Sequence, residues 1–242
     1  MEKSEGNIGD NMKTIGLLGG MTAESSAEYY KLINFFTRGK LGGNHSAKSI
    51  MVSVDFGEME PLMEKGEWDK LRSIMCDTAL SIEKGGADFL VICTNTIHKF
   101  ADHIEGILNI PVLNLIDAVA ERIKRKGFRT IGLLGTRFTM EEDFYKMRLK
   151  EKHGIRSIIP GKDDREFIHK VIVDELSIGN FNRSSREGYI DIIRKLSDAG
   201  AEGVILGCTE IPLLVKKEDC NIPMFDTTTI HAETAVDLAL ST

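Results

Sequence analysis

The chain has 242 residues, of which 42% are hydrophobic, so it can bury the core of one large domain or of two small ones. Acidic residues exceed basic ones by 37 to 31, and this mild net charge of -6 excludes bulk electrostatic recruitment of nucleic acid or of an anionic membrane. No apolar run is long enough to span a bilayer and the polar start lacks the apolar stretch of a signal peptide, so we expect a cytoplasmic protein.

Residues 1–12 are polar with scattered glycine and no periodicity, so we expect a frayed extension before a fold that begins near Lys13. From there, short apolar runs alternate with longer amphipathic stretches. The first four are TIGLLGG, SAEYYKLINFFTR, SIMVSVDF and WDKLRSIMCDTALSIEKGG. This βαβα order, with apolar strands such as FLVICT and GVILGCT that look buried on both faces, predicts an α/β fold with mostly parallel sheets.

The chain also repeats itself at a nearly constant spacing. TIGLLG recurs unchanged, GADFLVI recurs as GAEGVIL, and NIP recurs before another short apolar run. The repeat predicts two similar α/β domains related by a pseudo-twofold internal duplication, residues 13–126 and 127–242, with the final segment packing back on the first half. Ligands of open α/β sheets bind beyond the carboxyl ends of the strands, so we expect the active site in the crevice between the two domains.

Carrying the repeat past the third strand of each half pairs Thr94 with Cys208. Each half then offers a small proton-bearing side chain just beyond a buried strand. Two such ends facing each other could address both faces of a flat carbanion, which racemisation requires because one proton leaves Cα and another arrives from the opposite face. Cys208 lies in a Gly-Cys-Thr-Glu turn, where free backbone N–H groups favour a thiolate. The alternative is that Cys208 is an inert buried residue and that residues 94–96 only cap the next helix.

No motif indicates a cofactor or a metal. The glycine-rich segment 16–20 is not the GxGxxG dinucleotide fingerprint, and the sequence has no GxxxxGK[ST], no HExxH and no clustered Cys/His set. The four cysteines form no CxxC pair, so we expect free thiols.

These motifs resemble those of the aspartate/glutamate racemase family, and most closely its aspartate/glutamate-specific branch of broad amino-acid racemases. The matching stretches are IGLLGGMTAESSAEYY, GGNHSAKSIMVSVDF, CTNTIHKFAD, IGLLGTRFTMEEDFY, GVILGCTEIPLL and PMFDTTTIHAETAVD, spread over nearly all of residues 13 to 240. The resemblance implies an isomerase that racemises an amino acid without pyridoxal phosphate or metal, with one thiol from each half acting as acid and base.

This chain departs from the family pattern at the first thiol, where Thr94 aligns with the usual cysteine and Cys93 stands one place earlier. Because successive side chains on a strand point to opposite faces, we expect Cys93 to pack away from the crevice. Cys208 is then the base or acid on one face of Cα, and Thr94, with or without a water, serves the other. Cys93 remains the alternative for the second group.

The resemblance also indicates residues that would bind the substrate, and each of them could instead have a purely structural role. Met21 matches a pocket-lining position or fills the core, and Asn95, Thr96 and Thr209, with help from Thr136, would hold the α-carboxylate. Glu210 and His231 are candidates for binding the substrate ammonium group or for orienting Cys208. Arg137 and Lys162 are candidate cations for the distal carboxylate. His98 is a further candidate, and the alternative is that it faces solvent.

The leading functional hypothesis is therefore interconversion of L- and D-aspartate and/or glutamate by two-base proton transfer. Another cofactor-free carbanion enzyme of the same superfamily, of the maleate isomerase, malonate decarboxylase or hydantoin racemase type, is an alternative, as is a non-catalytic amino-acid-binding module. The expected partner is a small dicarboxylic amino acid, with no nucleic acid and no membrane. A homodimer is also expected, either through the apolar helix face around Tyr29, Tyr30, Leu32 and Ile33 or through another surface if that stripe is core.

Overall fold

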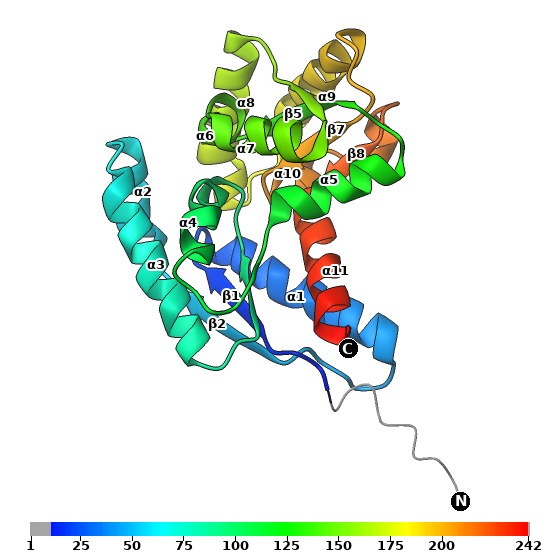
Figure 1. Cartoon of the computed structure of the whole chain (residues 1–242). Helices are drawn as coiled ribbons and strands as arrows, with labels where there is room; N and C mark the ends of the chain where they lie inside the picture. The colour runs from blue at the N-terminus through cyan, green and yellow to red at the C-terminus, as the bar shows by residue number, and fades with distance from the viewer. Residues whose placement is uncertain (1–10, 242) are drawn as a thin grey trace, which may run out of the picture. The chain divides into compact units, whose positions relative to one another are not determined.

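The computed structural model describes residues 11–241 (Figure 1). The expected frayed extension lies outside the described residues except at its end. There, Met12 is already buried in the core of the first sheet, so the fold starts slightly earlier than the sequence pattern indicates. No helix in the described range is long and apolar enough to cross a membrane.

The duplication predicted from the sequence is confirmed by two four-stranded parallel sheets with the same topology. In each sheet the first strand of the half lies between the second and the third, and the fourth strand lies at the far edge. The first sheet has the order β2-β1-β3-β4 and consists of β1 (Ile15–Gly19), β2 (Ser49–Ser53), β3 (Phe89–Ile92) and β4 (Val112–Leu113). The second has the order β6-β5-β7-β8 and consists of β5 (Thr130–Gly135), β6 (Arg156–Ile158), β7 (Val204–Gly207) and β8 (Met224–Asp226).

Helices connect the strands in the expected alternation. Between the strands of the first sheet lie α1 (Ala23–Leu41), α2 (Phe56–Glu64), α3 (Trp68–Lys84), the 3-10 helix η1 (Thr96–Phe100) and α4 (Ala101–Glu105). After β4 come α5 (Leu115–Arg125), α6 (Arg137–Glu141), α7 (Asp143–Met147), the π-helical turn η2 (Arg148–Lys152), α8 (Lys162–Asp174), η3 (Leu176–Ile178), α9 (Arg183–Asp198), α10 (Ile211–Leu214), η4 (Lys217–Asp219) and α11 (Thr227–Leu240).

Helix α5 illustrates how local sequence sets an element. Asn114 caps its start, since the side-chain oxygen accepts a hydrogen bond from the Ile116 N–H at 3.0 Å. Asp117 in the first turn and three basic residues in the last turn complement the helix dipole. Its apolar face packs with strands of the second sheet, among them residues of β5, β7 and β8.

The two compact units of the chain differ from the expected division at Gly127. Among the described residues, the first comprises residues 11–93, 100–113 and 231–241, and the second comprises residues 94–99 and 114–230. Residues 114–126 belong to the second unit because α5 buries its apolar face there. Helix α11 packs its alanines and Val236 with residues of β1 and α1, and it runs beside α1 in Figure 1.

The apolar stripe on α1 is mostly core. Tyr29 and Ile33 are fully buried in the first unit, whereas Tyr30 is 53% exposed. Phe35 on the same helix is 68% exposed. The exposed apolar surface of α1 therefore includes Tyr30 and Phe35 but not Tyr29 and Ile33.

Candidate active site

Two neighbouring strands of the second sheet end level with each other, next to polar residues. In the parallel register Gly135 of β5 pairs with Gly207 of β7, and the residues that follow are Thr136 and Cys208. A Cβ atom on Gly135 would lie 2.9 Å from the Gly207 carbonyl oxygen, so glycine is needed where the strand ends approach each other. Thr136 and Cys208 therefore share the carboxyl edge of the second sheet.

The segment Thr94–Lys99 follows a strand of the first sheet but belongs to the second unit. Its Asn95 donates a hydrogen bond from Nδ2 to the Thr227 hydroxyl at 3.1 Å, and that hydroxyl donates to the Leu206 carbonyl oxygen of β7 at 2.9 Å. Leu206 lies two residues before Cys208. Asn95 is thus linked through Thr227 to the strand whose end carries Cys208.

A row of threonine hydroxyls makes the second contact of this segment. The Thr96 hydroxyl lies 3.2 Å from that of Thr136, which lies 3.3 Å from that of Thr139. Thr136 also caps α6 by accepting a hydrogen bond from the Thr139 N–H at 3.4 Å. Two of the expected carboxylate-binding residues, Thr96 and Thr136, are therefore in contact, and a helix start lies beside them.

Cys208 and Glu210 form a hydrogen-bonded pair at this edge. The half-buried thiol donates a hydrogen bond to Glu210 Oε2 at 2.9 Å, and the Thr209 hydroxyl donates to the same oxygen at 2.7 Å. Burial, together with the charge of Glu210, raises the pKa of the Cys208 thiol well above its ordinary value, although backbone N–H groups lower it in part. The backbone N–H groups of the turn thus favour the thiolate, as expected, but burial and the Glu210 carboxylate outweigh them.

Cys93 belongs to the core of the first unit rather than to this edge. Its side chain is 1% exposed and packs among apolar residues of β1, α1 and α11, and burial raises the pKa of its thiol. Its carbonyl oxygen accepts a hydrogen bond from the Ser25 hydroxyl at 2.7 Å. This environment favours the packing role for Cys93 and leaves Thr94 as the better candidate for proton transfer.

Two buried polar side chains of the Thr94–Lys99 segment have unused hydrogen-bonding capacity. The Asn95 side chain is 5% exposed, and its Oδ1 atom has no hydrogen-bond partner. The Thr94 side chain is buried, and none of the hydrogen bonds found among residues 11–241 involves its hydroxyl. A buried acceptor without a partner is costly unless a ligand completes it, so Asn95 can receive an N–H group of a bound molecule.

His231 forms hydrogen bonds through both of its ring nitrogens. Its Nε2 donates to the Leu113 carbonyl oxygen at 2.8 Å, so its Nδ1 accepts from the Tyr29 hydroxyl at 2.9 Å. Both partners lie in the first unit, and the ring is fully buried. The imidazole therefore fixes α11 to β4 and α1 through both of its nitrogens.

The remaining candidates differ in exposure. Met21 is 8% exposed in the first unit, and Arg137 is exposed with its guanidinium 5.2 Å from the Phe138 ring centre. Lys162 has a side chain that is 78% exposed and pairs with Glu166 at 3.8 Å. Of the two cations, only Arg137 follows Thr136 directly at the sheet edge.

Sequence reasoning missed Thr227 and Thr139, which join the site residues to the second sheet. Both lie inside stretches that carry the resemblance, PMFDTTTIHAETAVD and IGLLGTRFTMEEDFY, but only the fold shows which hydroxyl in each stretch is turned inward. Within the described part of the chain, no group of three or more His, Cys, Asp or Glu side chains could hold a metal ion.

Comparison with known proteins gives a consistent match along the whole chain. The family model described as Asp/Glu/Hydantoin racemase matches residues 18–235. A crystal structure from Yersinia pestis, whose assignment as an Asp/Glu racemase is itself provisional, is 49% identical, covers 95% of this chain and 100% of its own, and superposes with a TM-score of 0.90. An aspartate racemase homologue from Pyrococcus horikoshii is 35% identical, with 95% and 100% coverage and a TM-score of 0.83. The broad specificity amino-acid racemase RacX of Bacillus subtilis is 20% identical over 232 residues, which cover 94% of this chain and 98% of RacX.

Proposed function

Because the chain belongs to the Asp/Glu/hydantoin racemase family and is an isomerase, we propose that it interconverts L- and D-aspartate and/or glutamate without a cofactor. The observation that carries the proposal is the Cys208–Glu210 hydrogen bond at the same sheet edge as the Thr94–Lys99 segment. The proposal combines the Cys208 thiol, the Glu210 carboxylate as its proton acceptor, and the Thr94 hydroxyl.

The proton transfers follow from these groups. The Cys208 thiol first passes its proton to the Glu210 carboxylate, 2.9 Å away, which leaves a thiolate and a neutral carboxylic acid. The thiolate then takes the Cα proton from one face of the substrate. The Thr94 hydroxyl gives a proton to the opposite face and regains one from water, and the hydroxide so formed is neutralised by the proton that Glu210 releases to solvent. The reverse sequence runs from the other enantiomer.

The surrounding polar groups suit an amino-acid zwitterion. The unpartnered Asn95 Oδ1 would accept an N–H of the substrate ammonium group. The Thr96 and Thr136 hydroxyls would donate to the α-carboxylate. Arg137, the first residue of α6, is the proposed partner of the distal carboxylate. A positive ammonium group near Cys208 would also lower the cost of the thiolate.

The test is proton NMR of each enantiomer of aspartate and glutamate with the protein in deuterated water, combined with polarimetry. We expect loss of the Cα–H signal together with loss of optical rotation for at least one amino acid. Cys208→Ser should lower kcat by about 10³-fold, since a serine hydroxyl is a far weaker acid than a thiol. Cys220→Ser, at another half-buried cysteine of the same unit, is the matched control and should behave like the unsubstituted protein.

Absence of exchange with all four substrates would contradict the proposal. Retained binding of an amino acid without exchange would then identify a binding module.

We further propose a homodimer, supported by the exposed Tyr30 and Phe35 on α1. Analytical ultracentrifugation of Phe35→Lys beside the unsubstituted chain tests it. An unchanged sedimentation coefficient would exclude this face.

A further inference from the structure

His98 joins the backbone of Thr94 to the start of α5. The ring is 4% exposed, and its Nε2 lies 3.0 Å from the Leu115 backbone nitrogen. An amide N–H can only donate, so Nε2 accepts and the single proton of the neutral ring is on Nδ1. Nδ1 lies 2.7 Å from the Thr94 carbonyl oxygen and therefore donates to it. Each nitrogen thus makes a different kind of bond to a different element.

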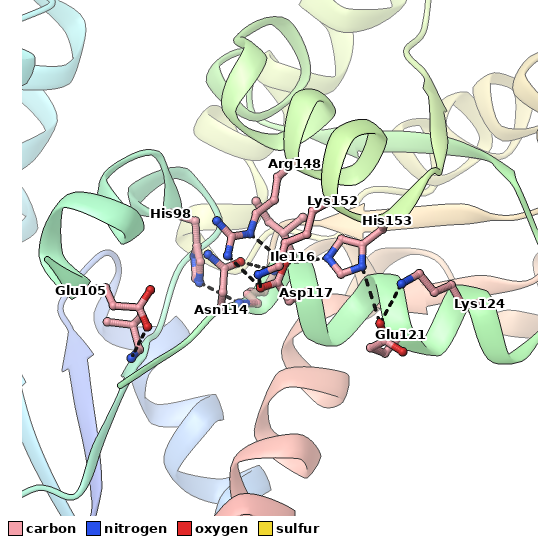
Figure 2. Close-up of polar contacts among 12 residues, drawn as sticks. His98, Glu105, Asn114, Ile116, Asp117, Glu121, Lys124, Arg148, Lys152 and His153 are labelled. Carbon is pink, nitrogen blue, oxygen red and sulfur yellow. Dashed lines mark hydrogen bonds and ion pairs between the residues drawn. The ribbon is translucent and has the colours of Figure 1, made fainter. Parts of the chain in front are cut away.

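The helix start that His98 contacts is firmly held. The capping bond of Asn114 fixes its first turn, and Asp117 in that turn accepts two hydrogen bonds from Arg148, each 2.8 Å long. Lys152 and His153 also contact Asp117, each at 2.7 Å. Figure 2 shows His98 beside Asn114, with Asp117 and its three basic partners next to them. A side chain bonded to this turn has a well-ordered anchor.

Thr94 needs such an anchor because its side chain has none of its own. In the proposed mechanism the Thr94 hydroxyl meets the substrate. Since this hydroxyl makes no hydrogen bond within residues 11–241, its position depends on the backbone of Thr94. The carbonyl of the same residue is held by His98. Proton transfer is sensitive to placement, and a displacement of about 1 Å can cost about 10²-fold in rate.

We propose that His98 is a positioning residue that holds Thr94 in line for proton transfer by clamping its carbonyl to the start of α5. This inference rests on the proposed role of Thr94. A histidine that merely fills the interior would serve equally through either ring nitrogen. A positioning residue acts through the Nδ1–H bond to Thr94, and the two nitrogens can be replaced separately.

The experiment uses His98→Asn and His98→Gln. The shorter asparagine places an amide N–H near the Nδ1 position and keeps the donor to Thr94, whereas glutamine places its amide oxygen near Nε2 and keeps only the acceptor for Leu115. His103→Asn and His103→Gln, at an exposed histidine of α4, are the matched controls. Circular dichroism melts of all four variants check folding.

The readout is the ratio of Cα–H exchange to inversion in deuterated water. For the enantiomer that Cys208 deprotonates, the thiol can exchange with solvent and return deuterium to the same face, whereas inversion requires Thr94. We expect His98→Gln to raise this ratio at least about 10-fold and to lower kcat with little change in KM. His98→Asn should stay within about 3-fold of the unsubstituted protein, and the His103 controls should be unchanged.

Three outcomes overturn the inference. Equal ratios in a folded His98→Gln variant and the unsubstituted protein would do so, as would equal impairment of His98→Asn and His98→Gln. In the unsubstituted protein, ¹⁵N-histidine NMR should show His98 as the Nδ1–H tautomer, and an Nε2–H tautomer would also refute the clamp. The Thr94→Ala variant distinguishes a failure of the His98 inference from a failure of the proposed role of Thr94. If it abolishes inversion while both His98 variants invert normally, only the His98 inference fails, whereas full inversion in Thr94→Ala removes the proposed role of Thr94 itself.

Discussion

At the scale of single residues, burial and the neighbouring Glu210 carboxylate determine the acidity of the Cys208 thiol. Burial raises the pKa of the thiol, and the Glu210 carboxylate raises it further while offering the acceptor at 2.9 Å. The same carboxylate therefore favours the protonated thiol and, in the proposed mechanism, is the group that takes its proton. An isolated buried thiol such as that of Cys93 has no such route.

Glu210→Gln should separate these two effects. Removing the negative charge should lower the pKa of Cys208, while kcat/KM should fall about 10²-fold because glutamine cannot accept the thiol proton. The pH dependence of thiolate ultraviolet absorbance measures the first effect and racemisation assays the second. An unchanged thiol pKa in this variant would show that Glu210 does not control Cys208.

His231 makes the stability of the protein depend on pH. Burial lowers the pKa of its imidazole from 6.5 to about 4. Between these values the unfolded chain binds a proton that the folded ring does not, so stability is fully present above pH 6.5 and falls as the pH drops toward 4. The expected loss is about 3 kcal/mol.

Urea unfolding at pH 7 and at pH 4.5 tests this expectation, with His231→Gln as the comparison. Glutamine keeps a donor for the Leu113 carbonyl but does not titrate. The variant should therefore lose less stability between the two pH values than the unsubstituted protein. Equal losses would assign the acid sensitivity to other groups.

At the scale of elements, the start of α5 is held by a charged cluster on η2. Burial would raise the pKa of Asp117, but hydrogen bonds from Arg148, His153 and Lys152 hold it well below its usual value. The folded carboxylate has the lower pKa, so its contribution is present above the ordinary value of 3.8 and is lost as the pH falls further.

Asp117→Asn should lower the free energy of unfolding by about 2 kcal/mol, because Arg148 and Lys152 lose the negative charge and one of the two acceptor oxygens that they share. Asp143→Asn is the control, since that side chain is 77% exposed and forms a pair with Lys146 that should contribute no more than about 0.5 kcal/mol. Thermal or urea denaturation at neutral pH measures both. A smaller effect at Asp117 than at Asp143 would contradict this assignment.

At the scale of the whole molecule, the duplicated halves do not each contain all of their own helices. The helix after β4 completes the second sheet, and the last helix from His231 onward completes the first. Cutting the chain at the sequence repeat therefore removes one helix from each sheet.

Fragments 11–126 and 127–241 should consequently be unfolded or aggregated when produced separately. In the first fragment, α11 no longer covers Ile15, Leu17 and Tyr29, and in the second, α5 no longer covers Ile131 and Leu133. Mixed or co-expressed fragments should assemble and regain the circular dichroism spectrum of the intact chain. A fragment that folds cooperatively on its own would show that the exchanged helices are dispensable.

The sequence by itself determined the strands, their parallel arrangement and the duplication, because these depend on local apolar runs and on repeated segments such as TIGLLG. It also indicated Thr94 and Cys208 as equivalent positions, since that pairing needs only a constant spacing. Both inferences use residues that are close in the chain or related by a simple offset.

Tertiary structure alone decided the transfer of α5 to the second unit, the direction of the Cys208 pKa shift and the use of both His98 nitrogens. Each depends on burial and on partners that the spacing of residues does not reveal. A helix with one apolar face can cover either sheet, and a thiol at a turn can be acidic or not. The physical reason is that packing selects among locally equivalent options according to which arrangement buries the most apolar surface and leaves the fewest polar groups unpaired.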